Sequence, residues 1–151
     1  VDIGVDNLLG GTNVHSVLSI IKGTKIKYYP FPGVIVGHPS VLSGSIEEIV
    51  KSSNKLAGHE GVHGLDLLAY RFAGDVTSLM TAVRSVTDKP VIIAGSIDCK
   101  KKIIEVMKSG ARAFTIGTAA LDGVYTSKGH NLTSQLIKII EDVAAIDSKD
   151  L

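Results

Sequence analysis

Two apolar runs near the end of the chain finish in the same way, with a glycine followed by a small hydroxyl residue. The run "VIIA" is followed by Gly95 and Ser96, and the run "AFTI" is followed by Gly117 and Thr118. Glycine allows a backbone to approach a ligand closely, and free backbone N–H groups at the start of a helix bind phosphate. Because the two runs are consecutive strand candidates, we expect these four residues to face one phosphate group.

Two charged residues lie inside apolar strand candidates. Lys27 lies in "KIKYYP", where it can be a solvent-facing lysine at a strand end or can bind a substrate carboxylate or phosphate without a covalent bond. Lys25 shares its face, so either lysine can be the inward one. Asp66 lies in "GLDLLAY", where a carboxylate is costly unless it is paired or functional. Asp66 can take a proton, orient Lys27 or form a buried salt bridge with it.

Three further residues have side chains suited to acid–base chemistry or anion binding. His38, between Gly37 and Pro39, is the best candidate for a general acid–base, although it can equally be turn structure. Tyr70 and Arg71 end a strand candidate, where Arg71 can hold a carboxylate or phosphate through two hydrogen bonds. The alternative for Arg71 is an exposed pair with Asp75.

The remaining histidines do not have the spacing of metal ligands, so the sequence indicates neither a metal nor an organic cofactor. The run Lys100 to Lys102 is expected to be a solvated helix face, with the alternative that one of these lysines reaches a phosphate.

These residues must be positioned by strands and helices. Along the chain, apolar runs alternate with segments of helical period, and this alternation predicts βα units around a parallel sheet. The predicted strands are Asp2–Asp6, Lys25–Tyr29, Leu65–Tyr70, Val91–Ala94 and Ala113–Ile116. The segment "GHPSVLSGS" is predicted to be a loop. Helices are predicted to start at Asn13, Ser45, Asp75, Asp98 and Asn131 or Thr133. The last of them carries an apolar stripe of Leu136, Ile137, Ile140 and Val143.

Five such units are compatible with two α/β architectures. One is a five-stranded, flavodoxin-like doubly wound sheet. The other is roughly strands 4–8 of a (βα)8 TIM barrel of the phosphate-binding type, in which the loops after strands seven and eight hold a phosphate. The two glycine-ended strands favour the barrel. We expect one domain over residues 1–151, with N-terminal units missing because the chain opens at Val1 on a strand-like segment.

The stretch "KPVIIAGSIDCKKKIIEVMKSGARAFTIGTAALDG", residues 89–123, resembles the C-terminal quarter of the ribulose-phosphate-binding barrel superfamily. That superfamily holds sugar-phosphate epimerases, decarboxylases and aldolases, so the resemblance implies a phosphorylated ligand. "KIKYYPFPG" is similar to the Lys-x-Phe-Pro signature of the 2-keto-3-deoxy-6-phosphogluconate aldolases, which implies a Schiff base at Lys27. In that family two strands follow the lysine strand, whereas three follow it here.

Two classes of function therefore stay open. The first is an enzyme acting on a small phosphorylated sugar or keto acid, by aldolase/lyase or isomerase/epimerase chemistry. The second is a non-enzymatic regulator, because the stretch at residues 89–123 is also similar to the glycerol-3-phosphate-responsive antiterminator family, whose small barrel acts on RNA. That family's "IAGG" is "IAGS" here. A doubly wound domain that binds nothing phosphorylated is a third interpretation.

The composition restricts the classes of partner that we expect and indicates a cellular compartment. The net charge of +1 over 151 residues gives no electrostatic basis for binding nucleic acid or a membrane surface. No apolar run approaches the roughly 18 residues of a membrane span. A single cysteine, Cys99, is typical of a reducing cytoplasm. Barrels of this type commonly pair, so a homo-oligomer is also compatible with the resemblance.

Overall fold

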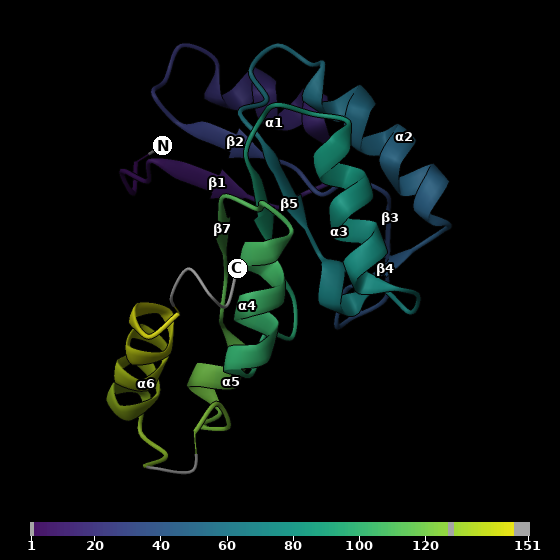
Figure 1. Cartoon of the computed structure of the whole chain (residues 1–151). Helices are drawn as coiled ribbons and strands as arrows, with labels where there is room; N and C mark the ends of the chain where they lie inside the picture. Colours follow the sequence, from purple (N-terminus) through teal and green to yellow (C-terminus); the bar gives the residue numbers. More distant parts are fainter. Residues whose placement is uncertain (1, 127–128, 147–151) are drawn as a thin grey trace.

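A computed structural model describes residues 2–126 and 129–146 and has an α/β fold (Figure 1). Its strands are β1 (Asn7–Leu9), β2 (Lys27–Tyr29), β3 (Val34–Val36), β4 (Val41–Ser43), β5 (Leu65–Leu67), β6 (Val91–Ile93) and β7 (Ala113–Phe114). Its helices are α1 (Val14–Ile21), α2 (Ile46–Ala57), α3 (Val76–Ser85), α4 (Lys100–Lys108), α5 (Thr118–Leu121) and α6 (Leu132–Ala144). A 3-10 turn, η1 (Ala69–Arg71), follows β5.

The parallel strands lie side by side in the order in which they occur in the sequence. β1 pairs with β2, and β5, β6 and β7 form a second parallel sheet in that order. A parallel bridge between Tyr28 and Val62, and a 3.0 Å bond from the Asp66 N–H to the Pro30 carbonyl, join the two sheets. Among the described strands the order never reverses, as it would in a doubly wound sheet, and the strands do not close into a barrel.

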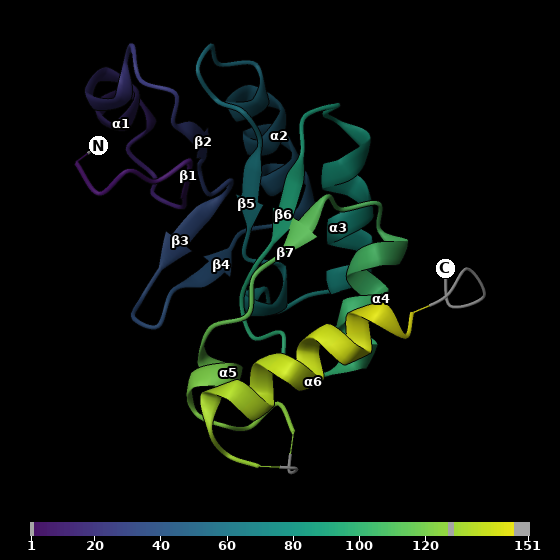
Figure 2. The ribbon, with the colours of Figure 1, turned by 90° about the vertical axis from the view of Figure 1, so that its left-hand side faces the viewer.

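Helices α2, α3 and α4 lie on the same side of the β5–β6–β7 sheet (Figure 2). The main core lies between them and the strands, with Leu65, Leu67 and Ile93 fully buried beneath Leu79 and Ile103. The helices cover a face of the sheet and not its edge (Figure 2), and the carboxyl ends of β5, β6 and β7 are open to a cleft.

The helix starts confirm most of the capping residues read from the sequence. Asn13, Ser45, Asp75 and Asn131 are all N-caps whose side chains accept a backbone hydrogen bond. Ser45 and Glu48 form the full capping box, in which the Ser45 N–H donates to Glu48 Oε2 at 2.7 Å. The Asp98 prediction is wrong, because α4 has Cys99 as its N-cap and the Asp98 carboxylate accepts from Lys102 instead.

Three predictions of local structure also need correction. The strand predicted at Leu65–Tyr70 ends at Leu67, because Ala69–Arg71 form the 3-10 turn η1. The first strand lies at Asn7–Leu9 and not at Asp2–Asp6, because Leu8 and Leu9 are the residues that become partly buried while residues 2–6 stay exposed. The segment around His38, predicted to be a loop, is the turn of an antiparallel hairpin in which β3 pairs with β4. Leu42 on β4 is 1% exposed, so burial of this one side chain fixes the hairpin against the core.

The last helix does not bury the apolar stripe that its sequence carries. Leu136, Ile137, Ile140 and Val143 are between 38% and 67% exposed. α6 lies alongside α4 and α5, away from the parallel sheet (Figures 1 and 2). Within the described residues, no helix has the length and apolar character needed to cross a membrane.

Candidate functional site

A cleft of about 380 Å³ opens where β5, β6 and β7 end, and it brings together most of the residues singled out in the sequence. Its lining includes Asp66, Arg71, Gly95, Ser96, Gly117 and Thr118. Asp66 lies on β5, and the other residues come from the segments that follow β5, β6 and β7. The parallel order of the strands therefore carries their successive loops to one edge of the sheet, as expected from the sequence.

The two loops present backbone N–H groups that the fold leaves unused. The Ala94 N–H still donates to the Leu67 carbonyl at 2.8 Å, and the Thr115 N–H to the Ile93 carbonyl at 2.9 Å. Beyond these last bonds of the sheet, no group of the described chain accepts a hydrogen bond from the backbone N–H of Gly95, Ser96, Gly117 or Thr118. Free backbone donors from two neighbouring loops, lining one cleft, are a suitable environment for an anion.

Arg71 stands against the first of these loops. A Cβ added at Gly95 would lie 2.8 Å from Cγ of Arg71, so the backbone there is closer to the arginine than a residue with a side chain could be. The Arg71 Nη1 donates to the Ser40 carbonyl in the β3–β4 turn at 3.1 Å. No ion pair joins Arg71 to Asp75 in the described chain, where Asp75 accepts from Ser78 instead. Arg71 therefore keeps guanidinium N–H groups for a ligand in the cleft.

Asp66 is the buried acid of the cleft. Its neighbours Leu65 and Leu67 face the core, so strand alternation turns the carboxyl to the opposite face of β5. The residue is 4% exposed, and its Oδ1 has no hydrogen-bond partner in the described part of the protein. Burial disfavours the charged form and raises the pKa of Asp66 to about 7. The carboxyl can therefore exchange a proton near neutral pH.

Lys27 does not approach Asp66, although the sequence predicts that the two side chains can meet. The bridge that pairs β2 with the chain before β5 joins Tyr28 to Val62, which places Lys27 below Asp66 along the strand direction. Lys27 is exposed and lines a different cavity of about 560 Å³, with Tyr29, Ile92 and Phe114. No ion pair between Lys27 and Asp66 exists among the described residues, so the buried salt bridge expected as one alternative is not present.

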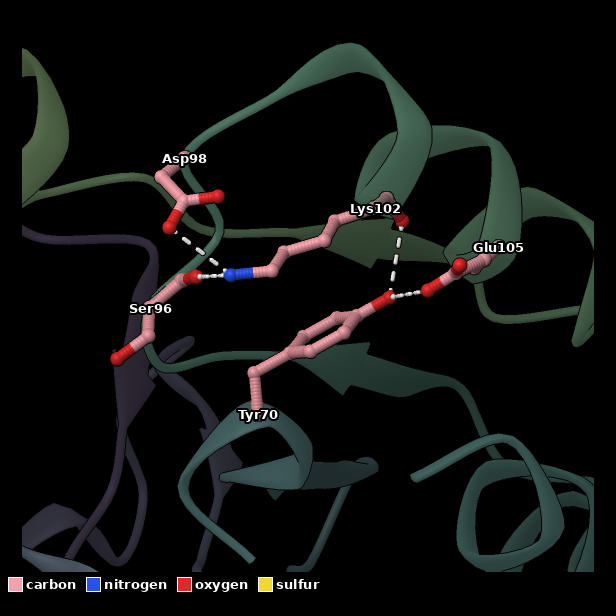
Figure 3. Close-up of polar contacts among 5 residues, drawn as sticks. All are labelled: Tyr70, Ser96, Asp98, Lys102 and Glu105. Carbon is pink, nitrogen blue, oxygen red and sulfur yellow. Dashed lines mark hydrogen bonds and ion pairs between the residues drawn. The ribbon is translucent and has the colours of Figure 1, made fainter. Parts of the chain in front are cut away.

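His38 and Tyr70 also lie outside the cleft lining. His38 is exposed at the turn between β3 and β4, and only the carboxyl end of that turn, at Ser40, reaches the cleft. The Tyr70 hydroxyl instead bonds to Glu105 Oε2 at 2.8 Å and to the Lys102 carbonyl at 3.1 Å, both on α4 (Figure 3). Burial, followed by the bond to Glu105, raises the pKa of Tyr70, which keeps the hydroxyl protonated.

Lys102 is the residue near the site that sequence reasoning did not single out. Its Nζ donates to the Ser96 carbonyl at 2.7 Å and to Asp98 Oδ2 at 2.9 Å, and lies 5.3 Å from the centre of the Tyr70 ring (Figure 3). The signal available was the spacing of Asp98 and Lys102, four residues apart and of opposite charge. The run of three lysines had instead indicated a solvated face.

Among the described residues, no three His, Cys, Asp or Glu side chains converge to form a possible metal site. The chain matches no protein-family model, and no match was found among curated proteins.

Proposed function

We propose that the cleft binds a small phosphorylated sugar or keto acid and that the protein is an enzyme acting on it. The observation that carries this proposal is that one cleft holds three features together. They are the free N–H groups of two adjacent loops, the guanidinium of Arg71 and the buried carboxyl of Asp66. The loops supply an anion site, and Asp66 supplies a group that can move a proton.

The anion site has two kinds of donor. A phosphate dianion accepts short hydrogen bonds from backbone N–H groups and binds guanidinium through paired bonds. Gly95, Ser96, Gly117 and Thr118 would hold the phosphate, and Arg71 would hold either that phosphate or a second anionic group of the ligand. A net charge near zero over the whole chain means that this attraction is local to the cleft.

Proton transfer is the chemistry that the cleft supports best. Asp66, with a pKa of about 7, is partly ionised at neutral pH and can take a proton from a hydroxyl group or from a carbon next to a carbonyl. The first step belongs to a retro-aldol cleavage and the second to an isomerisation or epimerisation. Lys27 lines another cavity, so imine chemistry has less support than acid–base chemistry.

The site also favours a particular architecture. Parallel strands in sequential order, helices on one side of the sheet and loops with free N–H groups after the last two strands are what the second half of a (βα)8 TIM barrel would present. We infer that the described strands form such a part of a phosphate-binding barrel.

A regulator that binds a phosphorylated metabolite without converting it is the second candidate. One observation favours it, namely that Asp66 is the single residue in the described cleft lining that can exchange a proton near neutral pH. Enzymes that isomerise sugar phosphates need an acid as well as a base, or one group that serves as both.

Binding and turnover can be separated in one experiment. The chain is incubated in D2O with inorganic phosphate, glycerol 3-phosphate, ribulose 5-phosphate or a phosphorylated 2-keto acid, and the ligands are followed by proton NMR. Binding together with deuterium exchange or cleavage supports the enzyme, and Asp66→Asn should abolish the exchange. Binding without conversion supports the regulator. If none of the four compounds binds, the proposed function is wrong.

A further inference from the structure

A polar cluster behind the loop that follows β6 holds that loop, and of its members only Ser96 belongs to the proposed anion site. It consists of Tyr70, Ser96, Asp98, Lys102 and Glu105 (Figure 3). We propose that Lys102 is a positioning residue for the anion site: it fixes the backbone at Ser96 and neutralises the carboxylate of Asp98. This inference rests on the proposed function, because it concerns the same cleft.

The backbone at Ser96 needs support from outside the loop. Ser96 has φ of 38°, in the left-handed region that residues with a Cβ rarely adopt. The Lys102 ammonium donates to the Ser96 carbonyl at 2.7 Å and therefore holds that oxygen toward α4. Because a trans peptide is planar, its carbonyl and the following N–H point in opposite directions. Fixing the Ser96 carbonyl thus turns the N–H of Ile97 away from α4.

That N–H is available to a ligand. Ile97 lines the cleft, and no group of the described chain accepts from its N–H. The same holds for Gly95 and Ser96, which precede it. Lys102 therefore orients a donor of the site without contacting the ligand itself.

Lys102 has a second effect through Asp98. This carboxylate lies next to the loop, and the hydrogen bond from Lys102 is the main cause that lowers its pKa, so it is ionised at neutral pH. An unpaired carboxylate beside the anion site would repel a phosphate. Lys102 Nζ, 2.9 Å from Asp98 Oδ2, offsets that charge.

The rest of the cluster keeps Lys102 where it is. The Tyr70 ring lies 5.3 Å from the ammonium, a distance at which the face of an aromatic ring attracts a cation. The Tyr70 hydroxyl is in turn bonded to Glu105 on α4 at 2.8 Å. This arrangement explains the position of Tyr70, which lies in η1 after β5 and turns to α4 and not into the cleft.

The neighbouring lysine provides a matched control. The Lys101 side chain is 86% exposed and has one long contact, 3.9 Å to Glu105 Oε1. Lys101 is also a lysine on α4 and carries the same charge as Lys102, but its side chain does not reach the loop. Lys101→Met therefore removes the same charge from α4 without touching Ser96 or Asp98.

The test uses the whole chain labelled with 15N, first without ligand and then titrated with inorganic phosphate and glycerol 3-phosphate. In Lys102→Met we expect the amide signals of Gly95, Ser96 and Ile97 to move before any ligand is added. We expect its Kd for phosphate to rise by about tenfold, as loss of a charged hydrogen bond predicts. Lys102→Arg should restore most of the affinity, and Lys101→Met should resemble the wild type in both measurements.

Adding Asp98→Asn to Lys102→Met separates the two effects. The double variant should recover part of the phosphate affinity, because the repelling charge is gone, while its loop signals stay displaced. If Lys102→Met leaves either the loop signals or the Kd unchanged, the positioning role is wrong and the proposed function stands. A wild-type chain that binds neither compound would instead overturn the proposed function, and the role of Lys102 with it. If Lys102→Met does not fold, Lys102→Gln, which also removes the ammonium group, is compared with Lys101→Met in the same titration. A Kd and loop signals of Lys102→Gln equal to those of the wild type would then also overturn the role.

Discussion

Gly95 and Arg71 are packed so closely that a Cβ at position 95 would lie 2.8 Å from Cγ of the arginine. The two residues come from different units of the fold, since Arg71 ends the 3-10 turn after β5 and Gly95 follows β6. Their contact sets how near the free backbone donors of one loop lie to the guanidinium from the neighbouring segment. It is the relationship on which the proposed anion site depends.

Gly95→Ala should therefore damage the site for two reasons. The residue has φ of 84°, which costs an alanine about 1–2 kcal/mol, and the new methyl group would displace Arg71. We expect lower stability in urea and weaker binding of phosphate. Gly58→Ala is the control, because Gly58 has right-handed helical angles at the end of α2. Equal phosphate affinity in the Gly95→Ala variant and the wild type would contradict the close approach.

Arg71→Met should weaken binding of phosphate by tenfold or more, since an arginine–phosphate pair contributes about 1.5–3 kcal/mol. The substitution keeps the stem that packs on Gly95 and removes the charge. Arg112→Met is the control, because Arg112 is exposed and does not line the cleft. Calorimetric titration measures both variants, and an identical loss in the two would show that total charge, and not the cleft, governs binding.

Asp66 should make the stability of the protein depend on pH. Its pKa is about 7 in the folded chain and 3.8 as a free side chain, so the unfolded state releases a proton first as pH rises. The free energy of unfolding should then fall between about pH 4 and pH 7, by about 1.4 kcal/mol for each pKa unit at most, and level off above pH 7. Urea unfolding of the wild type and Asp66→Asn at several pH values checks this. The same slope in both would show that another group is responsible.

The same residue should control turnover without controlling binding. Asp66→Asn is expected to lower proton exchange by about 10²–10⁴ while the Kd for inorganic phosphate stays close to that of the wild type. In the wild type the rate should rise as pH passes through about 7, because the base must be ionised. Full activity in the Asp66→Asn variant would remove Asp66 from the mechanism.

Lys27 should be dispensable for the reaction. It lines a cavity separate from the cleft, so borohydride reduction in the presence of a phosphorylated 2-keto acid should leave Lys27 unmodified. Mass spectrometry of the intact chain and its peptides detects such an adduct. A stable adduct at Lys27 would mean that the lysine reaches the substrate and that imine chemistry has to be reinstated.

The sequence predicted those features that depend on neighbouring residues. The helix start at Ser45 follows from a local capping box, and the glycines after β6 and β7 follow directly on apolar runs. Because sequential parallel strands align their carboxyl ends, those local patterns were sufficient to assemble the cleft from Asp66, Arg71 and the two loops.

The sequence could not predict the register of adjacent strands, that is, which of their residues lie opposite one another. Lys27 and Asp66 lie on neighbouring strands, but their separation depends on a register set by Tyr28 and Val62, which no local pattern encodes. The sequence pattern predicts a long loop around His38, whereas the valines on either side of it form the β3–β4 hairpin. The bond from Lys102 to the carbonyl of Ser96 could not be predicted, because that carbonyl is a backbone group that no side-chain motif identifies.

The central claim is that two neighbouring loops bind one phosphate group, and an NMR titration of the 15N-labelled chain tests it most directly. With glycerol 3-phosphate added, we predict that the amide signals of Gly95, Ser96, Gly117 and Thr118 move together and give one Kd. Signals that stay fixed in either loop, or that move instead around Lys27 and Tyr29, would contradict the account.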